Sequence, residues 1–323
     1  MFRLLAAGLA AMLITLFLGP KFIAFLRKNE FGQQIREEGP QEHHETKKGI
    51  PTLGGLLILV GMAVPFLILS ERSVAGLVVL LTTLGCAAIG FADDFAKIRM
   101  KRSLGLRARG KLALQLALSV IMGLVAVRYG GLNETVALPM SDYVLNIGIA
   151  YYFLIFLIVA GFSNAVNLTD GLDGLAAGAV AVTMLTYTGI TFLSDQSDLG
   201  ILSACLVGAC VGFLWFNSFP AEVFMGDTGS LALGGAIASM AVLTKTEVLL
   251  LVIGAIFVAE ALSVIVQVLS YKSFGKRVFM MTPIHHHFEL MAWSETKIIM
   301  RFWIVGAIFA STGFTIYYLS AGR

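Results

Sequence analysis

Residues Val74–Ala92, VAGLVVLLTTLGCAAIGFA, form an unbroken apolar run, and the next two residues are Asp93 and Asp94. A helix needs about 20 apolar residues to cross the ~30 Å hydrocarbon core of a bilayer. The run is therefore long enough for a transmembrane helix that ends on two adjacent carboxylates. Other apolar runs in the chain also end in polar residues whose side chains are suited to chemistry.

The composition of the whole chain agrees with a membrane protein. Of its 323 residues, 58% are hydrophobic and only 13% are charged, and the mean hydropathy is +0.86. A soluble domain has about a quarter of its residues charged. These values exclude a disordered protein, a soluble enzyme and a nucleic-acid binder, which needs a strongly basic face. The cysteines lie inside apolar runs and are expected to be small buried hydrophobic residues, not a disulfide or zinc site.

Ten apolar runs can cross a membrane, and no strong strand-like alternation is seen, so we expect an all-α integral membrane protein. The first run is too long for a signal peptide and lacks a cleavage site, so it is expected to remain as the first span. The loops are too short for a second domain, so residues 1–323 should form one polytopic unit. The runs are Phe2–Leu26, Thr52–Leu69, Val74–Ala92, Lys111–Val127, Asn146–Gly161, Leu175–Leu193, Leu199–Phe216, Ser230–Thr244, Val248–Leu269 and Ile298–Leu319.

Lysine and arginine gather in the loops after the first, third and ninth runs. Loops rich in these residues stay on the cytoplasmic side of a membrane. We therefore predict that these loops, with those after the fifth and seventh runs, face the cytoplasm and that both termini face outward. Lys47 and Lys48, in the first of these loops, are expected to be interfacial anchors.

Asp93 and Asp94 are the first of four polar clusters on this cytoplasmic face. Two carboxylates at the carboxyl end of a helix repel each other and oppose the helix dipole, so a cation should compensate them. The candidates are Mg²⁺, Lys97 and the basic residues that follow. The alternative is an interfacial end of the span that lipid headgroups solvate.

The second and third clusters follow the fifth and seventh runs. Asparagine and aspartate are turn and helix-cap residues, which is the alternative interpretation of both clusters. A Gly-Asp turn at the start of a helix is also suited to holding a phosphate together with its metal. The second cluster is Asn164-Ala-Val-Asn167-Leu-Thr-Asp170-Gly-Leu-Asp173-Gly174, and the third runs from Asn217 to Phe224-Met-Gly-Asp227-Thr-Gly-Ser230.

The fourth cluster, Pro283-Ile-His285-His286-His287-Phe-Glu289, contains three of the five histidines. Its spacing is poor for zinc, because consecutive residues on a helix point about 100° apart. Histidine can donate a hydrogen bond to phosphate oxygens, which suits an anionic substrate. Taken together, carboxylates that bind Mg²⁺ and cations that bind phosphate indicate phosphoryl transfer, with one substrate from the cytosol and one from the lipid.

These motifs resemble the signatures of the polyprenyl-phosphate N-acetylhexosamine-1-phosphate transferases. Ile50, Leu53 and Ala292 depart from the family pattern, and none of them is a candidate ligand. Three histidines followed by Phe288 and Glu289 favour the muramoyl-pentapeptide branch of the family. The resemblance is carried, in order, by Pro51-Thr-Leu-Gly-Gly55, Asp93-Asp94-x-x-Lys97, Asn164–Gly174, Phe224–Ser230, Pro283–Glu289 and Trp293-Ser-Glu-Thr-Lys297.

The resemblance implies transfer of phospho-N-acetylmuramoyl-pentapeptide from UDP-N-acetylmuramoyl-pentapeptide (UDP-MurNAc-pentapeptide) to undecaprenyl phosphate, with Mg²⁺, to give lipid I and UMP. One phosphoanhydride is broken and one is formed, so no ATP is required, and the sequence has no Gly-rich Lys-Ser/Thr loop for ATP. The chain would then be an enzyme of peptidoglycan synthesis in the bacterial cell membrane.

The resemblance also implies roles for the motif residues. Asp227 would coordinate Mg²⁺, Asp93 would deprotonate or orient the lipid phosphate, and Asp94 would position metal or substrate. Lys97 and Lys111 would attract phosphate. The other substrate-binding candidates are Asn164 and Phe224; Asn167, Asp170, Asp173 and Asn217 at the nucleotide end; and His285, His286 and His287 at sugar or diphosphate oxygens.

Two other functions share parts of this pattern. A UDP-N-acetylglucosamine transferase of the same family would carry similar motifs. A membrane transporter would instead place ionisable residues near the middle of the bilayer. Glu260 and Gln267, in the ninth run, are the main polar candidates there; they could also line a groove for the lipid phosphate or bend the helix. A homodimer that pairs through an apolar face is compatible with the sequence.

Overall fold

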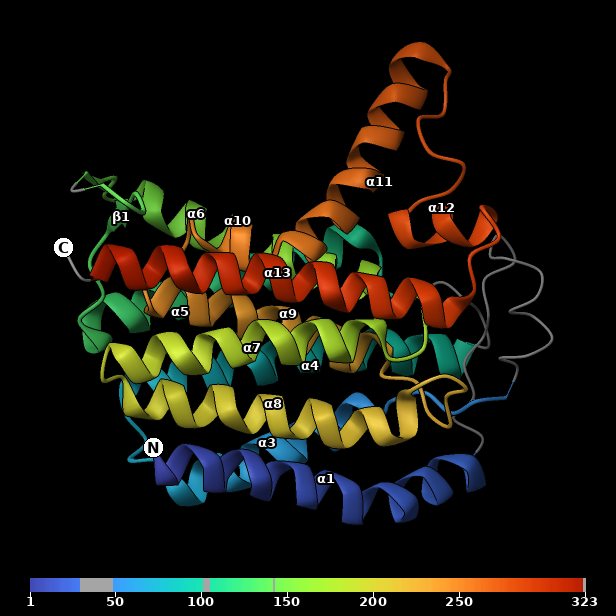
Figure 1. Cartoon of the computed structure of the whole chain (residues 1–323), viewed down its shortest axis with the longest axis horizontal. Coiled ribbons are helices and arrows are strands. Elements are labelled where there is room, and N and C mark those ends of the chain that lie inside the picture. The colour runs from blue at the N-terminus through green and yellow to red at the C-terminus, as the bar shows by residue number, and fades with distance from the viewer. Residues whose placement is uncertain (30–48, 101–104, 142, 322–323) are drawn as a thin grey trace.

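The computed structural model describes all residues except 30–48, 101–104, 142 and 322–323, so Lys47 and Lys48 lie outside the described residues. The described chain is a bundle of helices with one short hairpin (Figure 1). The helices are α1 (Phe2–Lys28), α3 (Gly55–Leu69), α4 (Val74–Met100), α5 (Ala108–Gly130), α6 (Ala150–Thr169), α7 (Leu175–Leu193), α8 (Ser197–Asn217), α9 (Gly226–Leu243), α10 (Leu250–Ile253), α11 (Ala255–Phe274), α12 (Ile284–Leu290) and α13 (Glu295–Ala321).

The predicted all-α membrane fold is confirmed. Within the described residues, nine helices are long and apolar enough to cross a membrane, and α3 adds a shorter apolar helix of 15 residues. Each of the ten predicted runs lies largely in a helix, the ninth in two. The N-terminus and the end of α13 lie at the same end of the bundle (Figure 1), as an even number of crossings requires. Which end faces the cytoplasm stays a prediction.

The structure differs from the expected elements in the loop between α5 and α6. Strands β1 (Thr135–Ala137) and β2 (Val144–Asn146) pair there as an antiparallel hairpin, with Val136 opposite Leu145. Three residues per strand are too few to show a period of two in the sequence. The hairpin therefore could not be recognised from the alternation of apolar and polar residues.

The ninth run is not one continuous helix. It divides at Gly254, which ends α10 and precedes α11 with a backbone outside the helical range, φ −99° and ψ 23°. Glycine weakens a helix, and here it packs where a Cβ would lie 2.6 Å from the Phe162 ring. Beyond this break, α11 projects away from the other helices (Figure 1).

Helix α9 lies at the centre of the bundle and is almost completely buried between α4 and α6. Its sequence, GDTGSLALGGAIASMAVL, is rich in small residues, which let helix backbones approach closely in a membrane. The approach is closest at Gly90 of α4, where a Cβ would lie 2.1 Å from the carbonyl oxygen of Asp227. This packing fixes the start of α9 against α4.

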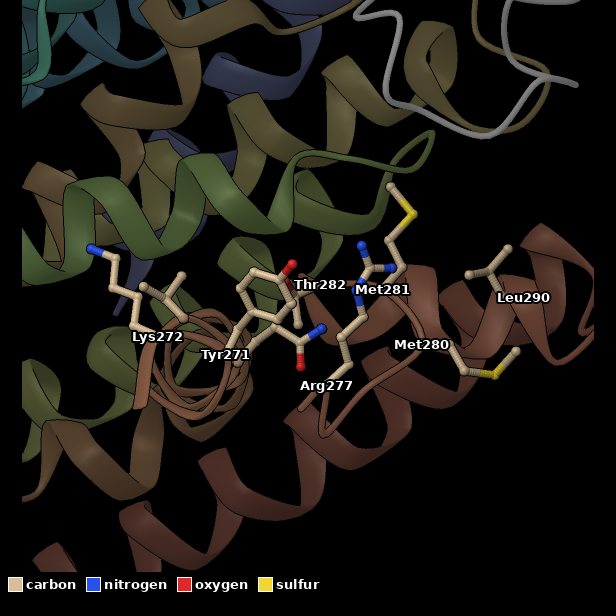
Figure 2. Close-up of a pocket in the computed structure, with 9 residues that line it drawn as sticks. Tyr271, Lys272, Arg277, Met280, Met281, Thr282 and Leu290 are labelled. Atoms are coloured by element: carbon tan, nitrogen blue, oxygen red, sulfur yellow. The ribbon is translucent and has the colours of Figure 1, made fainter. Parts of the chain in front are cut away.

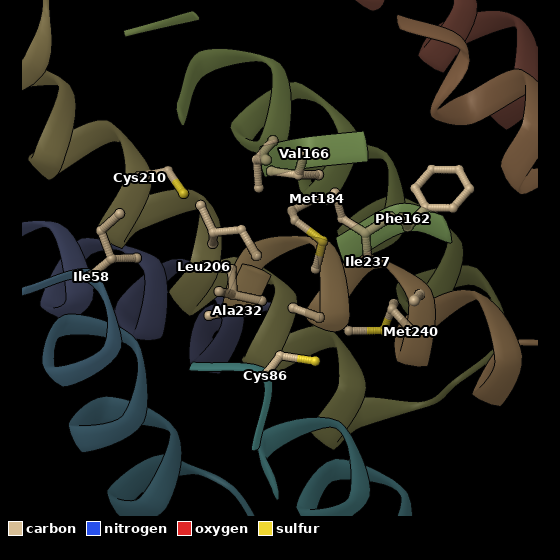
Figure 3. Packing of buried hydrophobic residues seen from close by; sticks show 14 of the residues in the cluster. Ile58, Cys86, Phe162, Val166, Met184, Leu206, Cys210, Ala232, Ile237 and Met240 are labelled. Atoms are coloured by element: carbon tan, nitrogen blue, oxygen red, sulfur yellow. The ribbon is translucent and has the colours of Figure 1, made fainter. Parts of the chain in front are cut away.

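The core around α9 is apolar and contains the cysteines (Figure 3). Cys86, Cys205 and Cys210 are free and buried, which confirms the prediction that they are hydrophobic core residues. Cys86 lies against Gly235 of α9, where a Cβ would be 2.6 Å from its sulfur.

Candidate active site

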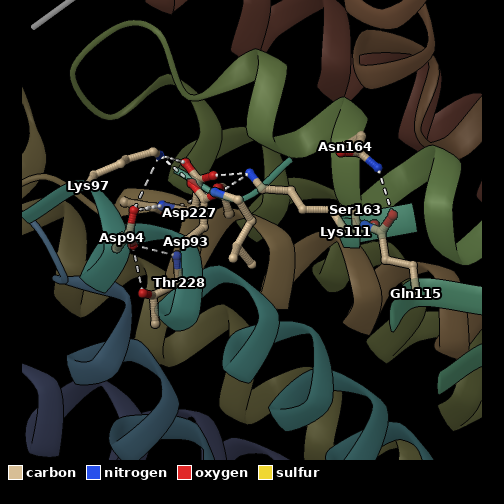
Figure 4. A network of polar contacts seen from close by, with 12 residues as sticks. Asp93, Asp94, Lys97, Lys111, Gln115, Ser163, Asn164, Asp227 and Thr228 are labelled. Atoms are coloured by element: carbon tan, nitrogen blue, oxygen red, sulfur yellow. Dashed lines mark hydrogen bonds and ion pairs between the residues drawn. The ribbon is translucent and has the colours of Figure 1, made fainter. Parts of the chain in front are cut away.

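Three aspartates from two helices meet at one end of the bundle. Asp93 and Asp94 come from α4, and Asp227 lies in the first turn of α9. One carboxylate oxygen from each lies within 4.8 Å of the others, and in the described part of the chain this is the group of acidic, histidine or cysteine ligands that could hold a metal ion (Figure 4). The fold therefore brings the candidate residue Asp227 to the Asp93–Asp94 pair, more than 130 positions away in the sequence.

We expected the helix to end at Asp93 and Asp94. It does not, because α4 continues to Met100. The pair lies about two turns before the helix end, where the helix dipole has little effect. The longer helix also places Lys97 four residues after Asp93 and three residues after Asp94, on the same face. One of the expected compensating cations, Lys97, is thus a residue of the same helix.

Two lysines bridge the aspartates. Lys97 Nζ lies 2.7 Å from an oxygen of Asp93 and 2.9 Å from Asp227, with Asp94 at 3.6 Å. Lys111, in the first turn of α5, lies 3.0 Å from Asp93 and 2.8 Å from Asp227. Three carboxylates against two ammonium groups leave this group of five residues, the aspartate–lysine cluster, with one excess negative charge.

Asp94 is bound to the start of α9. Its carboxylate accepts hydrogen bonds from the Thr228 backbone N–H at 2.9 Å, the Thr228 hydroxyl at 2.7 Å and the Asp227 N–H at 3.2 Å. The N-cap residue of α9 itself, Met225, makes no capping hydrogen bond with its side chain. Asp94 therefore caps α9 from another helix and orients Asp227, and Asp227 itself is not the N-cap.

Asp93 and Asp227 differ in exposure. The Asp93 side chain is 1% exposed and accepts a hydrogen bond of 2.6 Å from the Leu106 N–H, while Asp227 is 15% exposed. Lys97 and Lys111 are also partly exposed, at 23% and 18%. The open side of the cluster is therefore formed by Asp227 and the two lysines, the groups that we expect to bind metal and phosphate.

Asn164 is connected to the helix that carries Lys111. Its amide donates to Gln115 Oε1 at 3.2 Å, and Gln115 donates to the Ser163 hydroxyl at 2.8 Å (Figure 4). The sequence analysis did not identify Gln115 as a residue of the site. The available signal was its position four residues after Lys111, on the same face of an otherwise apolar helix.

Asp173 and Asn217 hold the second and third clusters, Asn164–Gly174 and Asn217–Ser230, together. The Asp173 carboxylate accepts a hydrogen bond of 2.9 Å from the Ala221 N–H. Asn217 accepts one from Gly174 N–H at 3.1 Å and donates one to Val223 at 2.8 Å. Both side chains are buried, so they shape this region by positioning backbone.

Asn167, Asp170 and Phe224 lie at the edges of these motifs. Asn167 is in the last turn of α6, Asp170 follows as its C-cap, and both are partly exposed. The Phe224 backbone N–H donates to the Pro51 carbonyl and its carbonyl accepts from the Gly54 N–H, each at 2.8 Å, which joins the Pro51–Gly55 motif to the third cluster.

The three histidines lie in α12 but have different surroundings. His285 is completely buried, and its Nδ1 lies 2.9 Å from Glu260 of α11. His286 pairs with Glu289, and the His287 Nδ1 accepts a hydrogen bond of 3.2 Å from the Met280 N–H.

His285 also contacts the second cluster, Asn164–Gly174. A Cβ on Gly171 would lie 2.3 Å from His285 Nε2, so only glycine fits there. With its ring enclosed by Gly171 and Glu260, His285 links α11, α12 and the Asn164–Gly174 motif. The partly exposed His286 and His287 are better placed than His285 for contact with a soluble substrate.

Comparison with known proteins places the chain among glycosyl transferases. Residues 76–245 match the family model described as glycosyl transferase family 4. The chain is 50% identical over 317 residues to the phospho-N-acetylmuramoyl-pentapeptide-transferase of Anoxybacillus flavithermus, with 97% of each chain covered. It is 48% and 47% identical to proteins of the same name from Desulfitobacterium hafniense and Rubrobacter xylanophilus, with 98% of each chain covered.

Proposed function

We propose that the aspartate–lysine cluster is the centre at which this enzyme transfers the phospho-N-acetylmuramoyl-pentapeptide group. The chain belongs to glycosyl transferase family 4 and, within it, to the phospho-N-acetylmuramoyl-pentapeptide-transferases. The chain is a multi-pass protein of the bacterial membrane and acts in peptidoglycan synthesis, at the formation of lipid I. Membership of a transferase family removes the reason to consider a transporter.

The substrates we propose are UDP-MurNAc-pentapeptide and undecaprenyl phosphate, with UMP as the second product. Both substrates carry phosphate, and the open side of the cluster offers two ammonium groups that currently pair with Asp227. As phosphate arrives, Lys97 and Lys111 can exchange Asp227 for phosphate oxygens. Asp227 then loses its two counter-ions, so another cation must compensate its negative charge.

The cofactor we propose is Mg²⁺. The donor set fits, since Mg²⁺ is commonly held by one or two carboxylates together with substrate phosphates, and the cluster has one more carboxylate than it has lysines. When bound, the ion would neutralise charge that develops on the transferred phosphate. Asp227 is the first choice of ligand because it is the most exposed carboxylate, and Asp94 is already occupied as the cap of α9.

Asp93 is proposed to act on the lipid phosphate, as a base or as an orienting group. It lies between both lysines, so a phosphate held by Lys97 and Lys111 would lie beside it. The second pKa of a phosphate monoester is near 6, so much of the substrate is already ionised and a strong base is not needed. The placement of the nucleotide and sugar near the Asn164–Gly174 motif and the histidines is part of the same proposal.

The experiment that tests the proposal replaces Asp227 by alanine and follows UMP release across a Mg²⁺ titration. We expect kcat to fall by about a thousandfold, because metal stabilisation of a transferring phosphate is worth several kcal/mol. Glu222→Ala is the matched control, since Glu222 is an exposed carboxylate at the same end of the bundle and pairs loosely with Arg27 at 3.8 Å. Wild-type turnover in Asp227→Ala would remove the assignment. UDP-N-acetylglucosamine in the same assay tests the choice of nucleotide sugar.

A further inference from the structure

A buried glutamine, Gln115, lies in α5 four residues after Lys111 of the aspartate–lysine cluster (Figure 4). Its side chain is 1% exposed, whereas the neighbouring side chains of Leu112, Leu114 and Leu116 face outward and are exposed. A polar group buried in a membrane protein destabilises it unless its hydrogen bonds are made. The hydrogen bonds of Gln115 therefore show what this residue does.

The direction of each hydrogen bond in this group is fixed by chemistry. The Ser163 hydroxyl has a single hydrogen and donates it to the Val159 carbonyl at 2.6 Å, so its oxygen accepts from the Gln115 amide nitrogen at 2.8 Å. Gln115 Oε1 therefore faces Asn164, whose amide nitrogen donates to it at 3.2 Å. The Ala160 carbonyl, 2.7 Å from the same nitrogen, independently requires a donor there.

The two bonds from Asn164 leave its oxygen for a ligand. Both amide hydrogens are used, by Gln115 and by the Ala160 carbonyl, and within the described residues Oδ1 takes no part in this network. Asn164 is partly exposed and begins the second cluster. An amide oxygen accepts hydrogen bonds and donates none. Asn164 is therefore suited to a hydroxyl or N–H group of a ligand, and it is not suited to the phosphate oxygens expected at Lys111.

Gln267 of α11 shows the contrasting use of a glutamine. It lines a pocket of about 580 Å³ near the end of α11 (Figure 2). Its side-chain oxygen accepts from the N–H groups of Val278 and Phe279 at 2.9 and 3.0 Å, and its amide donates to the Phe279 carbonyl at 2.9 Å. Gln267 therefore holds a backbone segment, whereas Gln115 holds the side chain of Asn164.

We propose that Gln115 is a positioning residue for the nucleotide-sugar substrate. It holds the Asn164 amide so that Oδ1 accepts a hydrogen bond from an O–H or N–H group of that substrate. This inference rests on the proposed function, in which UDP-MurNAc-pentapeptide binds near the second cluster. The nucleotide sugar has hydroxyl and amide N–H groups, whereas the ionised phosphate of undecaprenyl phosphate offers acceptor oxygens. Without Gln115, the Asn164 amide is free to rotate and to present N–H where an acceptor is needed.

A double-mutant cycle tests the inference, with the Kd for UDP-MurNAc-pentapeptide measured by calorimetry on the full chain in detergent, without the lipid substrate. We expect Gln115→Met to weaken binding about fivefold and Asn164→Ala about tenfold, which is the usual range for loss of one hydrogen bond. The double variant should bind as Asn164→Ala does, because Gln115 acts only through Asn164. Ser119→Ala is the matched control, since Ser119 is buried in the same helix and its hydroxyl donates within α5, to the Gln115 carbonyl at 2.6 Å.

Three results would overturn the inference. The first is equal binding by the wild type and Gln115→Met. The second is a loss of about fiftyfold in the double variant, the product of the single effects, which would give Gln115 a general role in packing. The third is an increased KM for undecaprenyl phosphate alone, which would assign Asn164 to the lipid phosphate. Gln115→Asn, whose amide is one methylene too short to reach Asn164, repeats the cycle if the methionine variant does not fold.

The inference and the proposed function can fail separately. Additive effects in the cycle, with wild-type binding intact, would reject the role of Gln115 alone. Wild-type turnover in Asp227→Ala would reject the assignment of the aspartate–lysine cluster and would leave the ratios of this cycle unchanged.

Discussion

The two ends of the bundle each contain buried carboxylates paired with lysine, and the two groups are built differently. The aspartate–lysine cluster lies where α9 begins. The second group, Tyr151, Lys245 and Glu247, lies just beyond the other end of α9, ~27 Å away along an 18-residue helix. Here Lys245 lies 3.1 Å from Glu247 and 2.9 Å from the Tyr151 hydroxyl, which donates to Glu247.

The difference lies in charge balance and in what the lysines hold. Lys245 is matched by one carboxylate, and its ammonium group also donates to the carbonyls of Asn133 and Thr135 beside the β-hairpin. Partial burial lowers the pKa of Lys245, although Glu247 opposes the shift. In the aspartate–lysine cluster there is one unmatched carboxylate, and both lysines pair with carboxylates.

This comparison separates scaffold from reactive site. The lysine at the hairpin end is fixed by backbone carbonyls, so its partners cannot be exchanged without loss of structure. Lys97 and Lys111 contact carboxylates that a metal ion could take over, so they are free to turn toward phosphate. We therefore expect substitutions at one end to reduce turnover and substitutions at the other to reduce stability.

The largest separation is expected for Asp93→Asn. It removes the excess negative charge, so the unfolding temperature should be unchanged or higher. The value of kcat should fall by about 10²- to 10⁴-fold, the usual contribution of a group that transfers or orients a proton. UMP release at several pH values, with a parallel unfolding curve, measures both quantities. Normal kcat with an increased KM for undecaprenyl phosphate alone would mark Asp93 as a binding residue.

Glu247→Gln is expected to give the opposite result. It leaves Lys245 without its counter-ion, and loss of one member of a buried ion pair costs about 3 kcal/mol or more. The apparent unfolding temperature in detergent should fall by several degrees while kcat is retained. Glu71→Gln is the control, because Glu71 pairs with Arg3 at 3.3 Å on the surface and such pairs contribute little. A large loss of turnover in folded Glu247→Gln would contradict the division between the two ends.

Lys111→Met tests the charge balance of the aspartate–lysine cluster. Without this ammonium group the excess negative charge rises from one to two, so Mg²⁺ should bind more tightly, while phosphate loses a partner. We expect kcat to fall by about tenfold, typical of the loss of one charge-assisted contact. The Mg²⁺ concentration for half-maximal activity should fall as well. An unchanged or higher Mg²⁺ requirement would show that Lys111 does not compete with the metal.

Much of this architecture was predictable because the bilayer constrains it. Ten apolar runs had to become helices, and the acidic motifs at their ends had to lie on one face. The pairing of Asp93 with Lys97 follows from spacing along one helix. The contact between Asp94 and Thr228 does not, because it depends on how closely α4 and α9 approach at Gly90.

The roles of the polar motif residues were harder to predict. Asp173 and Asn217 were expected to shape the nucleotide end, and the structure shows them binding the backbone of neighbouring loops. Nothing in the order of residues distinguishes a side chain that contacts substrate from one that positions a loop. The group of Tyr151, Lys245 and Glu247 was not recognised either, since Tyr151 comes from α6 while Lys245 and Glu247 lie far along the chain, in the turn between α9 and α10.

Glu260 and His285 form a third buried pair and refine the comparison, because they lie beside the motifs but are completely enclosed. If burial determines the role, this pair is scaffold. Glu260→Gln should then have a small effect, about twofold in kcat, because glutamine can still accept the hydrogen bond from His285 Nδ1. Glu260→Ala should lower kcat by about tenfold, because His285 loses the partner that holds its ring against Gly171. Rescue by glutamine is the decisive measurement. If Glu260→Gln is as damaging as Glu260→Ala, then the charge is required, and this pair belongs functionally with the aspartate–lysine cluster.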